Sequence, residues 1–213
     1  MSHRCLKQRT RGERVVEAAI AALSWVITIV SLALTVYYGQ KSSRLERQKK
    51  KLEWADLQAA ATDMGRKIKA SFTPVAILTP GLRGATFANL LQNEFSRQVP
   101  VFVGVSTWKE DPHAPLPESD SIAIETQRWE VAIPLAASRF PDGDILLLDD
   151  FVMSGDFMER LKKELVNAGV ASERIHSAAV VVTKVAMKNR KAPDFYWMVA
   201  EDDDFFFPWG KAR

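Results

Sequence analysis

The hydrophobic pattern changes character twice along the chain. Segment 18–40 reads AAIAALSWVITIVSLALTVYYGQ and contains no charged residue. Segment 41–70 spaces its apolar residues three, four and seven positions apart, as an amphipathic helix does. From residue 71 onward, short apolar runs alternate with helical patterns, which is typical of strands buried between helices. The 213 residues therefore predict an apolar N-terminal segment, a helix and one α/β body over 71–213.

The apolar segment is long enough to cross a membrane, because a hydrocarbon core about 30 Å thick needs a helix of about 20 apolar residues. Tyr37 and Tyr38 lie at the depth of an aromatic belt. A signal peptide would have a shorter apolar core of about 7–15 residues, and a buried core helix would not have charges at both ends. We predict a basic tail over 1–17, a transmembrane helix over 18–40 and a juxtamembrane helix or linker over 41–70.

Basic residues flank the predicted span on both sides almost equally, so charge alone does not decide its orientation. These clusters do not cover a face of the body, which makes a lipid bilayer the expected partner and excludes nucleic acid. The basic face of segment 41–70 either contacts anionic headgroups or is an ordinary solvated face, and pairing of this helix in a homodimer is a further alternative. A single cysteine, Cys5, excludes internal disulfides. The flanking residues are Arg4, Lys7, Arg9, Arg11, Arg14, Lys41, Arg44, Arg47, Lys49, Lys50 and Lys51.

The densest chemistry lies in segment 144–161, DILLLDDFVMSGDFMERL. Four consecutive apolar residues, 145–148, predict a strand covered on both faces. Asp149 and Asp150 follow at the carboxyl end of that strand, where open α/β sheets bind their ligands. A turn with Ser154 and Gly155 then opens a helical pattern, whose first backbone N–H groups suit an anion. A generic strand–turn–helix unit with two solvated acids is the alternative.

This segment resembles the phosphoribosyl-pyrophosphate loop of the type I phosphoribosyltransferases. The resemblance implies that Asp149 and Asp150 hold the ribose hydroxyls and Mg²⁺. It also implies that the turn holds the 5′-phosphate. Met153 and Phe157 depart from the family pattern, because neither side chain offers the hydroxyl or carboxyl group that the family has there. The residues assigned to phosphate and ribose are Val152, Met153, Ser154, Gly155, Asp156 and Phe157.

Asp156 presents a conflict within the predicted phosphate site. Asp156 and Glu159 have the spacing of a capping box, in which the Asp side chain accepts a hydrogen bond from a first-turn N–H group. The same N–H groups are needed by a 5′-phosphate, and a carboxylate beside a phosphate is a like-charge pair. Either Asp156 turns away, or the site prefers a ligand without a 5′-phosphate, or the cap has replaced the ligand.

The family resemblance extends to both ends of the body. Arg83 and Gly84 follow a predicted strand over 75–79 and match the small pyrophosphate-binding loop; an ordinary glycine turn is the alternative. The C-terminal part is similar to the 6-oxopurine branch. There the resemblance implies that Lys184 donates to the 6-oxo group, Phe205 stacks on the base and the Phe206 backbone reads an exocyclic group. A hydrophobic plug is the alternative for the phenylalanines. The Pro-rich segment 107–121 matches the family's flexible lid.

Together these features predict a Rossmann-like, mostly parallel sheet of the type I phosphoribosyltransferase fold, preceded by the two N-terminal helices. The resemblance implies transfer of ribose-5-phosphate from phosphoribosyl pyrophosphate to a purine-like base, with Mg²⁺. Since those substrates are cytosolic, we expect the body in the cytoplasm of a single-pass membrane protein. A membrane anchor does not benefit salvage chemistry, so a non-catalytic sensor of a purine nucleotide or nucleoside, in stress or phage defence, is the alternative. A membrane-tethered scaffold is the third.

Overall fold

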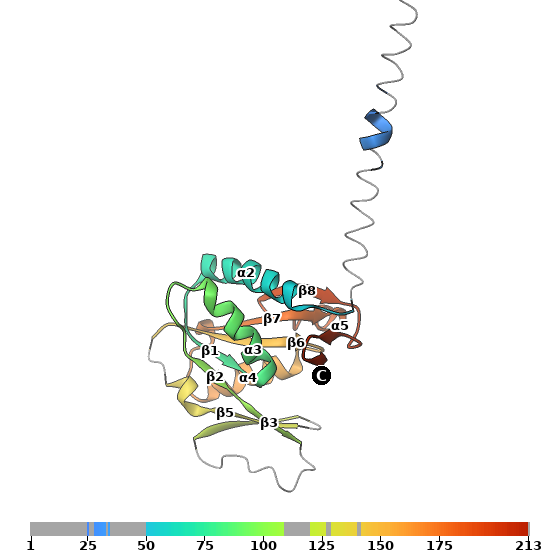
Figure 1. Ribbon diagram of the computed structural model, residues 1–213. Coiled ribbons are helices and arrows are strands. Elements are labelled where there is room, and N and C mark those ends of the chain that lie inside the picture. The colour runs from blue at the N-terminus through green and yellow to red at the C-terminus, as the bar shows by residue number, and fades with distance from the viewer. Residues whose placement is uncertain are drawn as a thin grey trace, which may run out of the picture. The chain divides into compact units, whose positions relative to one another are not determined.

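The computed structural model describes residues 50–108, 120–126, 129–139 and 142–212, together with helical residues at 25, 28–32 and 34. The chain forms two compact units, 1–47 and 48–213. The second is drawn with its elements labelled in Figure 1. Among the described residues, no helix is long and apolar enough to cross a bilayer. The predicted span over 18–40 lies mostly outside them, but its described apolar residues, such as Val30 and Leu34, are exposed.

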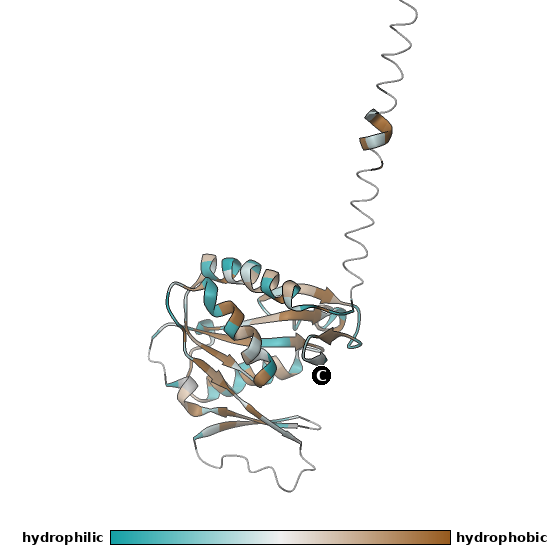
Figure 2. Ribbon diagram, viewed as in Figure 1, coloured by the Kyte–Doolittle hydropathy of each residue, from teal (hydrophilic) through white to brown (hydrophobic). Residues whose placement is uncertain are grey.

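A five-stranded parallel sheet is the centre of the second unit. Its strands are β1 (Pro74–Thr79), β2 (Val101–Val103), β6 (Asp144–Val152), β7 (Ile175–Thr183) and β8 (Phe195–Ala200). They are ordered β2-β1-β6-β7-β8, and every neighbouring pair is parallel. The apolar runs of β6 and β7 are buried, and Figure 2 shows both strands mostly in the colours of apolar residues. The prediction of an α/β fold with a mostly parallel sheet is confirmed.

Helices cover both faces of this sheet, as Figure 1 shows. The helices α2 (Trp54–Ser71) and α3 (Leu82–Leu91) share one apolar cluster with alternate residues of β6 and β7. The helix α4 (Asp156–Asn167) packs into a second cluster with the other residues of the same strands. The short helix α5 (Lys184–Lys188) directly follows β7. Strands buried on both faces explain why the apolar runs do not alternate.

Smaller elements complete the unit. The strands β2 and β3 (Val105–Trp108) are separated by Gly104 alone. The strand β3 joins an antiparallel sheet of order β3-β5-β4 with β4 (Ser121–Glu125) and β5 (Trp129–Pro134). Most of the predicted lid, 109–119, lies outside the described residues. Single 3₁₀ turns occur at Gln92–Glu94, Leu135–Ser138 and Ser172–Arg174. A C-terminal hairpin pairs β9 (Phe206–Phe207) with β10 (Gly210–Lys211).

The domain boundary that we expected at residue 71 was wrong. The helical period in segment 41–70 belongs to α2, whose apolar stripe of Leu57, Met64 and Ile68 is fully buried in the core. The chain before it, at Lys51, forms a parallel bridge with Phe206. The second unit therefore begins at residue 48, and α2 is a core helix of the body. The amphipathic pattern was visible in the sequence, but the surface that it packs against was not.

Replacing Met64 by Ala should test this assignment. Met64 is 0% exposed, so its truncation should lower the free energy of unfolding by about 2–5 kcal/mol. Gln58, on the exposed side of the same helix, is the matched control, and Gln58→Ala should change stability by less than about 0.5 kcal/mol. Urea denaturation of the full chain measures both. Equal, small effects would mean that α2 is not part of the core.

Candidate functional site

The acidic pair lies near the carboxyl end of β6, as predicted. Asp150 is only 4% exposed, and Asp149 is partly buried. The backbone N–H of Asp150 donates a hydrogen bond to Oδ1 of Asp149, with a donor–acceptor distance of 2.9 Å. The indole Nε1–H of Trp209 donates to Oδ2 of Asp150 at 2.8 Å. The two carboxylates are thus held in defined positions by one main-chain and one side-chain donor.

Burial controls the protonation of this pair. It raises the pKa of Asp149 well above the ordinary value, and the neighbouring Asp150 charge raises it further. Burial also raises the pKa of Asp150, against the opposing effect of the hydrogen bond from Trp209. Arg83 lowers both pKa values by its charge. A buried pair of like charges favours any ligand that brings positive charge to it.

Arg83 and Gly84 have different roles in the structure. Arg83 is in the first turn of α3, where its Nη1 donates to the Lys211 carbonyl at 2.8 Å and its charge acts on both acids. Gly84 lies where α3 crosses β6, and a Cβ atom there would approach the Leu148 carbonyl oxygen to 2.8 Å. Gly84 therefore permits close helix–strand packing, and it lies within α3, not in the turn that the alternative described. Arg83 stays a candidate for binding pyrophosphate.

The turn that we predicted to bind phosphate contains an internal anion. Gly155 is the N-cap residue of α4, with φ of +84°, and a Cβ there would lie 2.2 Å from the Lys191 carbonyl oxygen, so only glycine fits. The Asp156 carboxylate accepts a hydrogen bond from Ser154 Oγ at 2.9 Å and forms an ion pair with Lys191 Nζ at 2.5 Å. The capping box predicted for Asp156 and Glu159 was wrong, because Gly155 occupies the cap.

This arrangement changes what the turn offers a ligand. The hydrogen bond and charge of Lys191 lower the pKa of Asp156, so it stays ionised at neutral pH. Ser154 and Lys191 have the donor groups that suit a phosphate, and both are engaged by Asp156. Met153 is 52% exposed, while its carbonyl accepts a hydrogen bond from the buried Thr183 hydroxyl. Of the other residues assigned to this turn, Val152 is buried and Phe157 is partly buried.

The residues predicted to bind the base are not brought together. Phe205 is 1% exposed and packs against Phe151 and Phe207, so the stacking role was wrong and the hydrophobic plug is correct. The Phe206 N–H donates to the Lys50 carbonyl at 2.8 Å, and its carbonyl accepts from Leu52 at 2.9 Å, so its backbone is engaged within the protein.

Lys184 differs from the phenylalanines. It follows β7 at the carboxyl edge of the sheet, in the first turn of α5, where its ammonium is exposed and paired with Glu201 at 2.6 Å. Since β7 is the neighbour of β6, this edge is the one that also holds the acidic pair. Lys184 therefore remains a candidate for binding a base.

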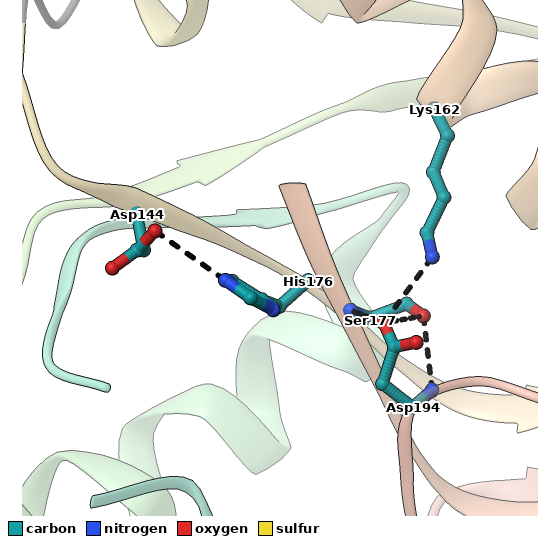
Figure 3. A network of polar contacts seen from close by, with 5 residues as sticks. All are labelled: Asp144, Lys162, His176, Ser177 and Asp194. Atoms are coloured by element: carbon teal, nitrogen blue, oxygen red, sulfur yellow. Dashed lines mark hydrogen bonds and ion pairs between the residues drawn. The ribbon is translucent and has the colours of Figure 1, made fainter. Parts of the chain in front are cut away.

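A second polar network lies at the opposite end of the sheet. Asp194 Oδ2 accepts hydrogen bonds from the N–H and the hydroxyl of Ser177, both at 2.7 Å, and pairs with Lys162 at 3.2 Å. Close by on β7, His176 lies 3.3 Å from Asp144 (Figure 3). Ser177 is near the amino end of β7, so this network joins the loop before β8 to the sheet and is structural.

Trp209 and Lys191 were not among the predicted site residues. Trp209 is 59 positions from its partner Asp150, and Lys191 is 35 from Asp156. No local spacing pattern relates residues so far apart. Both belong to segments that follow β7, and only the folded sheet brings them to the end of β6.

The donor set indicates which cation fits. Among the described residues, no three His, Cys, Asp or Glu side chains gather closely enough to hold a metal ion. Two carboxylates alone suit Mg²⁺, which keeps several waters and takes further oxygen ligands from substrate phosphates. Asp149 and Asp150 would hold it. The site therefore fits a cation that arrives with a phosphorylated ligand.

Comparison with known proteins identifies the family. The family model described as phosphoribosyl transferase domain matches residues 48–212, and the chain belongs to that family. The prediction of a phosphoribosyltransferase is thereby confirmed at the level of the family. The match begins where the second unit begins, which agrees with the corrected boundary. No curated protein matches the chain in sequence.

Solved structures agree with this fold. A purine phosphoribosyltransferase from Pyrococcus horikoshii is 17% identical, with a TM-score of 0.51 over 77% of this chain and 95% of that one. A Helicobacter pylori xanthine-guanine-hypoxanthine phosphoribosyltransferase is 15% identical, with a TM-score of 0.51 over 76% and 94%. A Neisseria gonorrhoeae protein with bound ppGpp is 20% identical, with a TM-score of 0.54 over 76% and 89%. At these identities, the likeness establishes the fold alone.

The raised pKa values predict a stability change with pH. A carboxylate whose pKa is raised in the folded state binds more protons there, so its contribution to stability falls as pH rises from about 4 through the folded-state pKa. Asp149→Asn removes the titrating group and with it this loss of stability at higher pH. The variant should gain stability over the native chain as pH rises toward 8, and the two should converge near pH 4. Urea titrations at several pH values measure the difference, and a constant difference would contradict the raised pKa.

Proposed function

We propose that the second unit binds phosphoribosyl pyrophosphate with Mg²⁺ at the acidic pair and transfers ribose-5-phosphate to a purine-like base. The observation that supports this most directly is the pair of adjacent carboxylates at the carboxyl end of β6 in a chain of this family, with Asp150 buried and Asp149 partly buried. Buried like charges without a cation are costly. A ribose with two hydroxyl donors and a bound divalent cation would satisfy both carboxylates.

The residues of the site would each bind a different part of the substrates. Asp149 and Asp150 would accept hydrogen bonds from the ribose hydroxyls and fix the sugar. Mg²⁺ would neutralise charge on the departing pyrophosphate. Arg83, whose charge already acts on both acids, would bind that pyrophosphate. Lys184 would donate to the base from the end of β7. Since Phe205 is buried, base stacking would have to come from another group, and the identity of the base stays open.

The phosphate turn supports a second candidate function, a non-catalytic sensor of a purine nucleotide. The Asp156 carboxylate accepts hydrogen bonds from Ser154 and Lys191, which makes both side chains less available to a 5′-phosphate. Met153 cannot act as an acid or a base. One structural neighbour, the Neisseria protein, holds ppGpp, a purine nucleotide. A sensor would bind such a nucleotide without turnover and report to the N-terminal segment.

Placement at a membrane is part of the proposal. The uncharged segment 18–40 supports a single span, and the substrate chemistry supports a cytoplasmic body. Basic residues on both sides would contact anionic lipid headgroups. A homodimer formed through the N-terminal part is compatible with this placement and stays a prediction.

The activity can be measured directly. The purified chain with Mg²⁺, phosphoribosyl pyrophosphate and a panel of purine bases should release pyrophosphate and form a nucleotide. Asp150→Asn should abolish release. Asp144→Asn, at the other end of the same strand, is the matched control and should retain it. Tight nucleotide binding without release, by the native chain, would favour the sensor. If the native chain neither binds a nucleotide nor releases pyrophosphate, both proposed functions are contradicted.

Asp156→Ala should tighten the binding of phosphoribosyl pyrophosphate. The change removes a like charge, whose repulsion of a phosphate about 4 Å away costs about 1 kcal/mol in water, and it frees Ser154 and Lys191. We expect affinity to rise about fivefold by titration calorimetry with Mg²⁺. Glu159→Ala, an exposed acid in the same helical turn, should have little effect. Weaker binding by Asp156→Ala would show that the ion pair holds the turn in its binding conformation.

Membrane insertion should fail when charges are placed in the span. Val30→Arg and Leu34→Arg should each cost about 2.5–3.5 kcal/mol near the helix centre. The double variant should move from the membrane fraction to the soluble fraction, while the exchange of both residues for Ala should not. Recovery of the native chain in the soluble fraction without detergent would contradict the proposed span.

A further inference from the structure

The segment through which residues 1–47 join the second unit pairs directly with the C-terminal hairpin. Lys51 forms a parallel bridge with Phe206. On either side of it, the Phe206 N–H donates to the Lys50 carbonyl at 2.8 Å and the Leu52 N–H donates to the Phe206 carbonyl at 2.9 Å. Leu52 is fully buried, which fixes the segment to the core. We call residues 50–54 the entry segment.

The hairpin connects this entry segment to the acidic pair. Trp54, at the start of α2, meets the ring of Trp209 edge-on, with ring centroids 5.8 Å apart and planes inclined by 64°. Trp209 stacks on Phe207 of β9 at 5.2 Å, with an interplanar angle of 4°. The same indole donates to Asp150 at 2.8 Å. One side chain therefore touches the entry segment, the hairpin and the ligand site.

The hairpin also contacts Arg83, the positively charged residue beside the acidic pair. The Lys211 carbonyl, on β10, accepts from Arg83 at 2.8 Å. A shift of the hairpin would thus move the donor to Asp150 and the support of Arg83 together. Exposed ion pairs from Asp204 to Lys50 and Lys211 also link entry segment and hairpin, but such pairs contribute little. The backbone bridge and the tryptophan contacts are the stronger connection.

We propose that Trp209 is a positioning residue for Asp150, and that the Trp54–Trp209 contact couples the entry segment to ligand binding at the acidic pair. This inference rests on the proposed function, and it assigns that site a regulation. A charge-assisted hydrogen bond to a buried carboxylate selects one orientation of the side chain. Because coupling is reciprocal, a change at the entry segment would alter affinity, and a bound ligand would stabilise one arrangement of the entry segment.

A double-mutant cycle tests the coupling on the full-length chain, purified in detergent. Trp209→Phe keeps the aromatic contact but removes the indole donor, and should weaken phosphoribosyl pyrophosphate binding with Mg²⁺ about tenfold by calorimetry. Trp54→Leu should weaken it severalfold. The double variant should bind no more weakly than Trp209→Phe alone, because both changes act through one hydrogen bond. Trp197→Phe, in β8 against the same core cluster, is the matched control and should bind as the native chain does.

The inference would be overturned if Trp209→Phe bound phosphoribosyl pyrophosphate with native affinity. It would also be overturned if the double variant lost affinity by the product of the two single losses. If the native chain does not bind phosphoribosyl pyrophosphate, the proposed function fails separately. The positioning role is then judged from ¹H–¹⁵N spectra, in which the Trp209 indole resonance is identified by its loss in Trp209→Phe. Its N–H proton should exchange slowly with water because it is hydrogen-bonded to Asp150, and Trp54→Leu should speed that exchange. An exchange rate that Trp54→Leu leaves unchanged would overturn the inference on its own.

Discussion

The removal from water of two adjacent carboxylates near the end of the central strand, Asp150 buried and Asp149 partly buried, is the constraint on which the site depends. A carboxylate removed from water must be hydrogen-bonded or paired, or it retains its proton. Here Asp150 receives one indole donor and lies near Arg83, while Asp149 receives one backbone N–H. These partners do not restore the ordinary pKa of either acid. The strand, α3 and the C-terminal hairpin therefore hold a pair of acids that a cationic or hydroxyl-bearing ligand would stabilise.

The central strand and the acidic pair near its end could be predicted because their signals are local. An unbroken apolar run specifies a strand buried on both faces, and acids that directly follow it must lie at its carboxyl end. The three consecutive phenylalanines gave no such signal. Their hydrophobicity is equal, and only the pairing of β9 with the entry segment determines that Phe205 and Phe207 face the core while Phe206 is exposed. The predicted stacking role failed for that reason.

The phosphate turn shows a second limit of local patterns. Asp156 and Glu159 have the spacing of a capping box, but the left-handed conformation of Gly155 makes the glycine the cap and leaves the Asp156 side chain to Ser154 and Lys191. Lys191 reaches this turn only because the loop after α5 packs against Gly155. Contacts made by residues distant in sequence thus decide whether the turn presents donors or an anion. The hydrogen bond from Trp209 to Asp150 likewise joins residues distant in sequence, and no local pattern predicts it.

Crystals grown with phosphoribosyl pyrophosphate and Mn²⁺ in place of Mg²⁺ test most directly whether the acidic pair is the ligand site. Anomalous scattering locates the manganese independently of the rest of the structure. A peak within coordination distance of the Asp149 or Asp150 carboxylate, or bridged to one of them through the ribose hydroxyls, is the result that we predict. Ordered phosphoribosyl pyrophosphate with its manganese remote from both carboxylates would contradict the central claim.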